Sequence, residues 1–143
     1  MRSRRLVRTA EGSEISVILS DEKEFLLEAA AAKKPAIGIG GEGQIPIEAC
    51  RYVVERIEDI DEDFLRKAAY RYAGLPLEIA QTKRLRIREL TPDDFKIFPK
   101  SPLSAKDRYF AGEDLQLFFC EEKFYAYIRW RYDFYDYGIW AIL

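Results

Sequence analysis

Residues 15–39, ISVILSDEKEFLLEAAAAKKPAIGI, predict a strand, a helix and a second strand in direct succession. The run Ile15–Leu19 is short, apolar and rich in β-branched residues, which favours a buried strand. Asp21 stands at the expected N-cap of the helix, with a glutamate three residues later in the spacing of a capping box. Pro35 ends the helix because proline cannot continue it, and Ala36–Ile39 predicts the next strand.

Two further elements follow in the first half of the chain. Residues 52–55, YVVE, predict a third strand, and Asp61 opens a helix with acidic residues at the positive end of its dipole. The apolar residues of this helix recur at helical spacing, at Leu65, Ala68, Ala69 and Tyr72. Gly74 and Pro76 terminate it. The order of elements predicts an α/β fold over residues 13–76, a small three-layer unit with a largely parallel sheet.

The second half of the chain, residues 82–143, predicts a mixed α/β domain. Residues 84–88 alternate arginine with an apolar residue, which is typical of a half-exposed strand. The stretch 91–94, TPDD, predicts a helix start, since it combines an N-cap threonine, a proline and two acids. A long helix is expected over about 113–135. Residues 139–143, IWAIL, predict a fully buried strand.

The composition excludes several function classes. The chain has 143 residues, with 23 Lys and Arg, 25 Asp and Glu, two cysteines and no histidine. The lack of histidine excludes Ser-His-Asp and Cys-His catalysis and histidine metal sites, and no metal site is predicted. The net charge of −2 gives no strong attraction to nucleic acid, which is not predicted as a partner. Cys50 and Cys120 lack CxxC spacing and predict buried thiols in a reducing cytoplasm; the alternative, a disulfide between them, has no signal in the sequence.

Targeting signals are also lacking in the sequence. No stretch reaches the roughly 18 apolar residues of a membrane span, and so no membrane partner is predicted. Arg2, Arg4, Arg5 and Arg8 make the start of the chain basic, but the apolar run of a signal peptide does not follow them. Residues 1–12 are therefore predicted to be a basic N-terminal tail, and the protein is predicted to be cytoplasmic.

Residues 38–43, GIGGEG, match the dinucleotide-binding fingerprint as text. That site needs its glycines to lead directly into a helix whose N-terminal amides hold a pyrophosphate. Pro46 and the strand from Tyr52 follow too closely for a crossover helix, which with its loops takes about 10–12 residues. A glycine turn is the favoured interpretation, and a phosphate- or nucleotide-binding domain in this half of the chain is the least favoured function.

Two further patterns have structural explanations. Asp59, Asp61 and Asp63 match half of a calcium loop, but Phe64 stands where glycine is required, so acids at a helix start explain them better. A set of cations among aromatics would suit a nucleic-acid face: Lys83, Arg84, Arg86, Arg88, Arg129 and Arg131. A solvated sheet face explains the strand arginines, and a core stripe explains the nine aromatics of residues 124–143.

Residues 82–95, TKRLRIRELTPDDF, resemble the first strand and the start of the first helix of GNAT-type N-acetyltransferases. Residues 126–143, AYIRWRYDFYDYGIWAIL, are similar to the second helix of that family running into its second strand. The resemblance implies an incomplete GNAT-like domain over residues 82–143, truncated after its second strand. It also implies the activity of the family, the transfer of acetyl from the cofactor acetyl-CoA to an amine.

Family members hold the cofactor pyrophosphate on an Arg/Gln-x-x-Gly-x-Gly/Ala loop after their fourth strand. The resemblance reaches only to the second strand, and so it implies no catalytic or cofactor-binding residue in this sequence. The chain is expected to be inactive for the same reason. The matched region shapes the acceptor side of the cleft in the family, and this places Tyr135, Tyr137 and the 99–112 loop near the acceptor substrate.

Residues 13–76 resemble, more faintly, a Rossmann-like unit of the haloacid-dehalogenase class, which can precede such acetyltransferase domains. The paired aspartates of that class are absent from the start of the chain, so phosphatase activity is not implied. The alternative function is a non-catalytic interaction or regulatory module. Such a module would pair with another copy through the open edge of the strand at 139–143 and form a homo-oligomer.

Overall fold

Two units make up the chain, residues 1–75 and residues 76–143, and each has its own sheet. The computed structural model describes residues 1–41, 43–46, 48–96 and 120–143. The protein is of the mixed α/β class, as the sequence predicts. The sequence changes character near Leu75, which is the last residue of the first unit.

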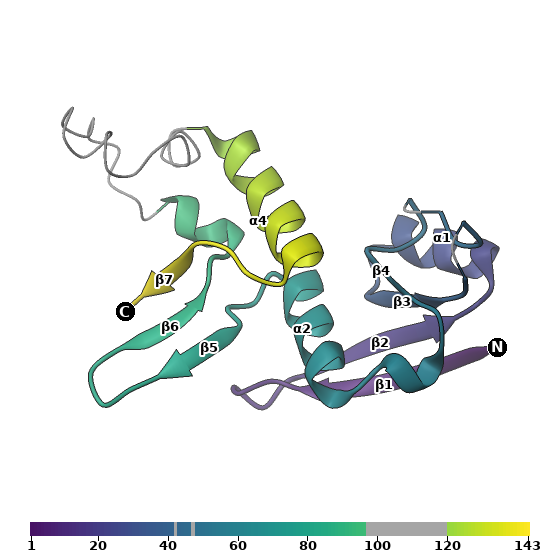
Figure 1. The fold of residues 1–143 in the computed structure, drawn as a ribbon, viewed down its shortest axis with the longest axis horizontal. Helices are drawn as coiled ribbons and strands as arrows, with labels where there is room; N and C mark the ends of the chain where they lie inside the picture. The colour runs from purple at the N-terminus through teal and green to yellow at the C-terminus, as the bar shows by residue number, and fades with distance from the viewer. Residues whose placement is uncertain (42, 47, 97–119) are drawn as a thin grey trace. The chain divides into compact units, whose positions relative to one another are not determined.

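A four-stranded sheet forms the centre of the first unit (Figure 1). Its strands, in spatial order, are β1 (Arg2–Arg8), β2 (Glu14–Ser20), β3 (Ala36–Ile39) and β4 (Tyr52–Val54). β1 pairs antiparallel with β2, whereas β2, β3 and β4 run parallel to one another. The three strands predicted in this half are present, and the parallel pairing expected among them is confirmed.

The basic tail predicted over residues 1–12 is wrong, because most of that segment forms β1. β1 pairs with β2 along its whole length, through a turn in which Gly12 has a φ of +86°. The arginines that suggested a tail are mostly exposed, but Val7 of the same strand is buried against the unit. β1 is stabilised by the backbone hydrogen bonds of a complete ladder and by the burial of Val7. These interactions order a segment whose charged side chains alone would favour solvent.

One face of the four-stranded sheet is covered by α1 (Lys23–Ala31). Leu26 and Ala29 of this helix form one apolar cluster with Ile18 of β2 and Ala36 of β3. Ile18 and Ala36 are register partners in the parallel pair, so both side chains point to the same face. The strand–helix–strand segment of residues 15–39 therefore packs against itself and forms an apolar core.

The opposite face is covered by α2 (Glu62–Ala73). The ring of Tyr52 in β4 lies 5.8 Å from that of Phe64 in α2, centroid to centroid. Tyr52 is the register partner of Ile37, which follows Ala36 along β3 and so points away from α1. The first unit therefore has three layers, with one helix on each side of its sheet.

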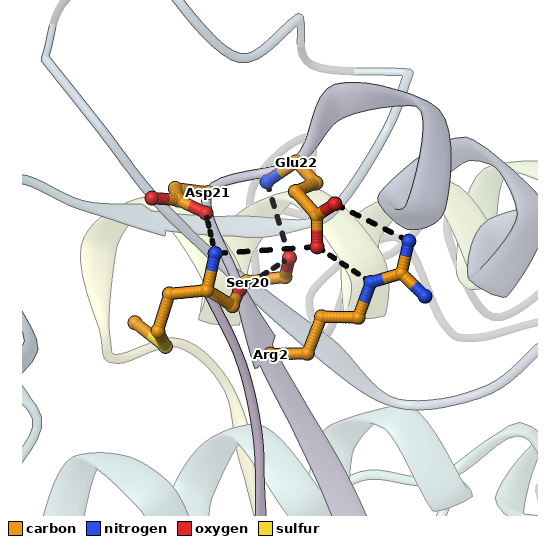
Figure 2. A network of polar contacts seen from close by, with 5 residues as sticks. Arg2, Ser20, Asp21 and Glu22 are labelled. Atoms are coloured by element: carbon orange, nitrogen blue, oxygen red, sulfur yellow. Dashed lines mark hydrogen bonds and ion pairs between the residues drawn. The ribbon is translucent and has the colours of Figure 1, made fainter.

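The predicted N-cap role of Asp21 is wrong. The N-cap of α1 is Glu22, whose backbone N–H donates to the Ser20 hydroxyl at 3.1 Å. The Asp21 carboxylate instead accepts a hydrogen bond from the α-amino group of Met1 at 2.6 Å, and Glu22 accepts one from Arg2 at 2.5 Å (Figure 2). These bonds lower the pKa values of both carboxyl groups. The N-terminus and Arg2 lie beside the start of α1, where they pair with Asp21 and Glu22.

A three-stranded antiparallel sheet lies in the second unit. Its strands, in spatial order, are β5 (Glu78–Gln81), β6 (Arg86–Glu89) and β7 (Trp140–Ile142). The 3-10 helix η2 (Pro92–Lys96) follows β6, and α4 (Glu121–Tyr135) precedes β7. The helix start predicted at 91–94 is thus a 3-10 helix in the described residues. Residues 113–119 of the predicted long helix lie outside the described residues, and its remainder is confirmed from Glu121.

The core of the second unit forms between α4 and the sheet. Phe124 and Tyr132 of α4 are each 1% exposed and cluster with Leu90, which follows β6. The prediction that 139–143 is a fully buried strand is wrong, because Ile142 is 65% exposed. In the described residues β7 pairs only with β6, so it lies at an edge of the sheet and one of its sides stays open.

Candidate functional site

Aromatic side chains gather on the surface of α4 and on the turn after it. The interpretation of the whole stretch 124–143 as a core stripe is wrong: only Phe124 and Tyr132 are deeply buried, whereas Trp130 is 65% exposed and Phe134 73% exposed. We call this group the aromatic face, and its members are the exposed Trp130, Phe134, Tyr135 and Tyr137 together with the partly buried Tyr127. Large exposed apolar groups in contact with one another mark an interaction or binding surface.

A groove of about 410 Å³ lies within the aromatic face. Its lining comprises Tyr127, Trp130, Arg131, Phe134 and Tyr135. The Arg131 guanidinium lies over two of the neighbouring rings, 4.7 Å from the centroid of Tyr135 and 5.7 Å from that of Tyr137. Its Nε is buried and has no hydrogen-bond partner among the described residues. Arg131 is therefore held by cation–π contacts and keeps a donor unused.

The turn that positions Tyr137 is fixed by two tyrosines of α4. α4 ends at Tyr135, and its C-cap Asp136 adopts the left-handed conformation with a φ of 60°. Ile139 then donates its backbone N–H to the Tyr127 hydroxyl at 2.9 Å, while its carbonyl accepts from the Tyr132 hydroxyl. The Tyr132 oxygen also accepts the backbone N–H of Leu90 at 3.0 Å, so α4, β7 and the end of β6 meet at one hydroxyl.

Glycine is required at position 138 by close packing. A Cβ there would lie 2.9 Å from Cγ of Arg131 and 3.0 Å from both the Tyr127 hydroxyl and the Tyr132 ring. Atoms at such distances must move apart. The chain thus passes closely over α4, and this close approach carries Tyr137 to the side of Tyr135.

Tyr135 and Tyr137, expected near an acceptor substrate, do lie side by side. Their ring centroids are 6.0 Å apart, and they are 49% and 54% exposed. The 99–112 loop, which was expected beside them, lies outside the described residues. The sequence analysis named Arg131 only in a possible nucleic-acid face and missed its contact with these tyrosines, although its i, i+4 spacing from Tyr135 on a helix was a usable signal.

The glycines of residues 38–43 have a packing role at the end of β3. A Cβ on Gly38 would lie 2.8 Å from both the Cys50 sulfur and Cδ1 of Ile45. No helix begins between Gly40 and β4 in the described residues, and the Gly40 N–H donates to Val54 at 2.9 Å. The amides of this segment therefore do not form the helix N-terminus on which a dinucleotide pyrophosphate would bind.

The aspartates at 59, 61 and 63 have separate structural partners. Asp59 closes the 3-10 turn η1 (Ile57–Asp59) by accepting from Arg56 at 3.2 Å. Asp61 is the N-cap of α2 and accepts from the Phe64 N–H at 2.7 Å. Asp63 pairs along the helix with Arg66 and Lys67. No group of three or more metal-ligating side chains comes together within the described residues.

The arginines of β6 have acidic partners in the second unit. Arg86 pairs with Glu78 of β5 at 3.2 Å, and Arg88 forms a two-point ion pair with Asp94 of η2. The Arg88–Asp94 pair was not foreseen from the sequence, which suggested a solvated sheet face for both arginines. Both guanidinium groups therefore have a carboxylate partner within the second unit.

Comparisons with known proteins leave the family open. No family model matches the chain, and neither a curated protein nor a solved structure is significantly similar to it. None of the helices in the described ranges combines the length and the apolar character of a membrane span.

Proposed function

We propose that residues 82–143 form the acceptor-side part of a GNAT-type N-acetyltransferase domain, whose reaction is acetyl transfer from acetyl-CoA to an amine. The observation that carries the proposal is the order of elements around α4. β6 leads into η2, and α4 leads through the Gly138 turn into β7, which returns antiparallel to β6. This order of strand, helix start, helix and strand agrees with what the sequence resemblance implies for the opening of that fold.

The aromatic face supports an amine as the acceptor. A protonated amine is attracted to the faces of aromatic rings, and most strongly to indole. Arg131 already lies over Tyr135 and Tyr137, so the rings open to an incoming ammonium group are those of Trp130 and Phe134.

The chain itself supplies no cofactor loop for this reaction. Oriented backbone amides at a helix N-terminus are what holds a pyrophosphate in the family, and these 143 residues contain no Arg/Gln-x-x-Gly-x-Gly/Ala sequence. We therefore propose that the 143-residue chain alone does not bind acetyl-CoA. Isothermal titration of the chain with acetyl-CoA tests this, and we expect no saturable heat. Saturable micromolar binding would overturn the proposed absence of the cofactor site.

The acceptor proposal has its own test, which does not need the cofactor. Titration with n-butylamine at neutral pH should shift the indole NMR signal of Trp130, whereas 1-butanol, which has no charge, should not. Phe134→Ala, which removes the other open ring of the aromatic face, should weaken this shift, and Tyr125→Ala, at an exposed tyrosine of α4 outside that face, should leave it unchanged. An equal response to amine and alcohol, or no response to either, contradicts an amine-binding face.

A second candidate function is favoured by the open edge of β7. Leu143 and Arg86 exchange both backbone hydrogen bonds, at 2.9 and 3.0 Å. Bonded and non-bonded residues alternate along an antiparallel pair, so the N–H of Ile142 points away from β6. Trp140 and Ile142 also expose apolar side chains, and such an edge is suited to pairing with a strand of another copy. This is the non-catalytic interaction module.

The mass of the chain in solution separates the two candidates. Pairing through β7 predicts a dimer that Ile142→Pro converts to a monomer, because proline removes the outward N–H but none of the bonds to β6. Ile142→Ala keeps that N–H and should remain dimeric. A wild-type chain that stays monomeric at every concentration measured excludes the strand-pairing module and leaves the acetyltransferase proposal untouched.

A further inference from the structure

The first unit contains a basic strand edge that the proposed function does not use. Four of the seven residues of β1 are arginines, although residues 1–75 as a whole carry more acidic than basic side chains. Arg2 pairs with Glu22 and Arg8 with Glu14. Arg4 and Arg5 are exposed and form no ion pair with any described residue. The strand therefore presents two uncompensated cations at an edge of the sheet.

The backbone of β1 also has unused hydrogen-bonding groups. Ile18, the register partner of Arg4, donates its N–H to Pro35 on the β3 side, and thus away from β1. At the end of the same ladder, the Thr9 N–H donates to Ser13 at 2.7 Å. Hydrogen-bonded and non-bonded residue pairs alternate along an antiparallel ladder. Both hydrogen bonds therefore indicate that the backbone N–H and C=O groups of Arg4 and Leu6 point away from β2. On that side the described sheet has no further strand.

A groove lies beside this edge, between β1 and α1. It has a volume of about 590 Å³, and its lining includes Ile18, Phe25 and Ala32 together with the cations Arg4 and Lys34. Arg2 also contributes to it, with its guanidinium 4.1 Å from the centroid of the Phe25 ring. Such a volume is in the range that accommodates a bound ligand or several side chains.

The side chains that line this groove are suited to an occupant that carries both negative charge and apolar groups. Glu28 is the single carboxylate among the lining residues, against three cations. Leu6 is 62% exposed and, two residues after Arg4 along the strand, has its side chain on the α1 face as well. The groove thus combines cationic and apolar side chains, and β1 adds outward backbone groups beside it.

We propose that β1 and the groove beside it bind an extended acidic peptide segment of a partner protein. The segment adds to the open edge of β1 through backbone hydrogen bonds and places alternate side chains in the groove. Its carboxylates on the α1 face pair with Arg4 and Lys34. A small anion would leave the backbone groups of the edge unused, and a second copy of β1 would set its own arginines against these, which is unfavourable.

Binding is tested with a capped, fluorescein-labelled peptide of alternating glutamate and valine, measured by anisotropy on the 143-residue chain. We expect saturable binding, and none for the same peptide with lysine in place of glutamate. Arg4→Glu should weaken binding by about tenfold or more, since an attraction between opposite charges is replaced by repulsion. Arg84→Glu makes the same charge change at an exposed arginine of the second unit and should alter the affinity by less than about twofold.

Two matched pairs of variants separate docking from simple attraction between charges. Ala32→Trp fills the groove and should abolish binding, whereas Ala31→Trp, at an exposed alanine that does not line the groove, should not. Leu6→Pro removes an outward N–H and should weaken binding more than Leu6→Ala does. Circular dichroism confirms that each variant is folded, and the Ala32 and Ala31 pair decides the matter if Leu6→Pro does not fold.

The proposal is overturned if the wild-type chain does not bind the peptide. It is also overturned if Ala32→Trp binds the peptide as tightly as Ala31→Trp while Arg4→Glu still weakens binding, because the peptide is then attracted by charge without occupying the groove. Neither result bears on the acetyltransferase proposal, which concerns residues of the second unit.

Discussion

Arg88 of β6 and Asp94 of η2 form a two-point ion pair, with both nitrogen–oxygen distances at 2.8 Å and only 15% and 7% of the side chains exposed. The Asp94 carboxylate also accepts the backbone N–H of Thr91 at 2.7 Å. Burial alone would raise the pKa of Asp94, but the bonds from Arg88 and Thr91 outweigh it and hold that pKa below its usual value. The pair fixes the start of η2 to the end of β6.

Asp94→Asn should lower the free energy of unfolding of the second unit by about 2–4 kcal/mol, because it leaves the Arg88 guanidinium buried without its counter-charge. Chemical denaturation of wild type and variant measures the difference. Asp93→Asn is the matched control, since the neighbouring Asp93 side chain is 89% exposed and should change stability by less than about 0.5 kcal/mol. Equal effects of the two variants would show that the buried pair adds no stability.

Stability of the second unit should also fall at acid pH. The native pKa of Asp94 is lowered, so its contribution is present above the ordinary carboxyl pKa of about 4 and is lost as the pH falls through the lower native value. Denaturation at a series of pH values from neutral to about pH 3 should show a decline. In Asp94→Asn the decline should be shallower, and an unchanged slope would contradict this assignment.

Tyr132→Phe should destabilise the second unit by about 1–3 kcal/mol. Its hydroxyl bonds both to Leu90 and to Ile139, and its removal leaves the buried Leu90 N–H without that acceptor. Thermal unfolding measures the loss. Tyr125→Phe removes a hydroxyl from the same helix, where the bond to Glu121 is exposed, and should have almost no effect.

Gly138→Ala should cost about 1–3 kcal/mol, since the new methyl group would press on Arg131, Tyr127 and Tyr132. The same strain should move Tyr137 away from Tyr135, which NMR contacts between the two rings would reveal. Gly41→Ala is the control, because its Cβ would meet nothing closer than 3.5 Å. Unchanged stability in Gly138→Ala would contradict the close packing of this turn against α4.

The two cysteines should differ in reactivity. Burial raises the pKa of the Cys50 thiol, so at pH 8 little of it is the reactive thiolate, and the side chain is enclosed as well. Cys120 is only partly buried, contrary to the prediction that both thiols are buried. Iodoacetamide should therefore label Cys120 first, and Cys50 only as the chain unfolds. Mass spectrometry of the labelled peptides reports the order.

The first unit could be predicted well where local signals agreed with the tertiary structure. The strand at 15–19 and the period of α2 recur in the structure, whereas α1 ends at Ala31, before the predicted stop at Pro35. β1 was missed because its apolar content is low, and its stability comes from pairing with β2, a long-range contact that no local pattern reports. Asp21 was misplaced for the same reason, since its partner Met1 is distant in sequence.

The candidate site was harder to predict. The helical period of residues 121–135 was clear, but period alone does not say which face of the helix is covered. Tyr135 and Tyr137 were named from a resemblance, and their contact with Arg131 depends on the close approach at Gly138. The Arg88–Asp94 pair joins a strand to a separate turn, and alternation along the strand indicated only that its arginines would be solvated.

The division of the chain after Leu75 also separates its fluorophores. Both tryptophans, Trp130 and Trp140, belong to the second unit, and the first unit contains none. Indole emission therefore reports on one half of the molecule, while far-ultraviolet dichroism reports on both. A melting curve recorded with the two signals together should show whether the halves unfold in one step or in two.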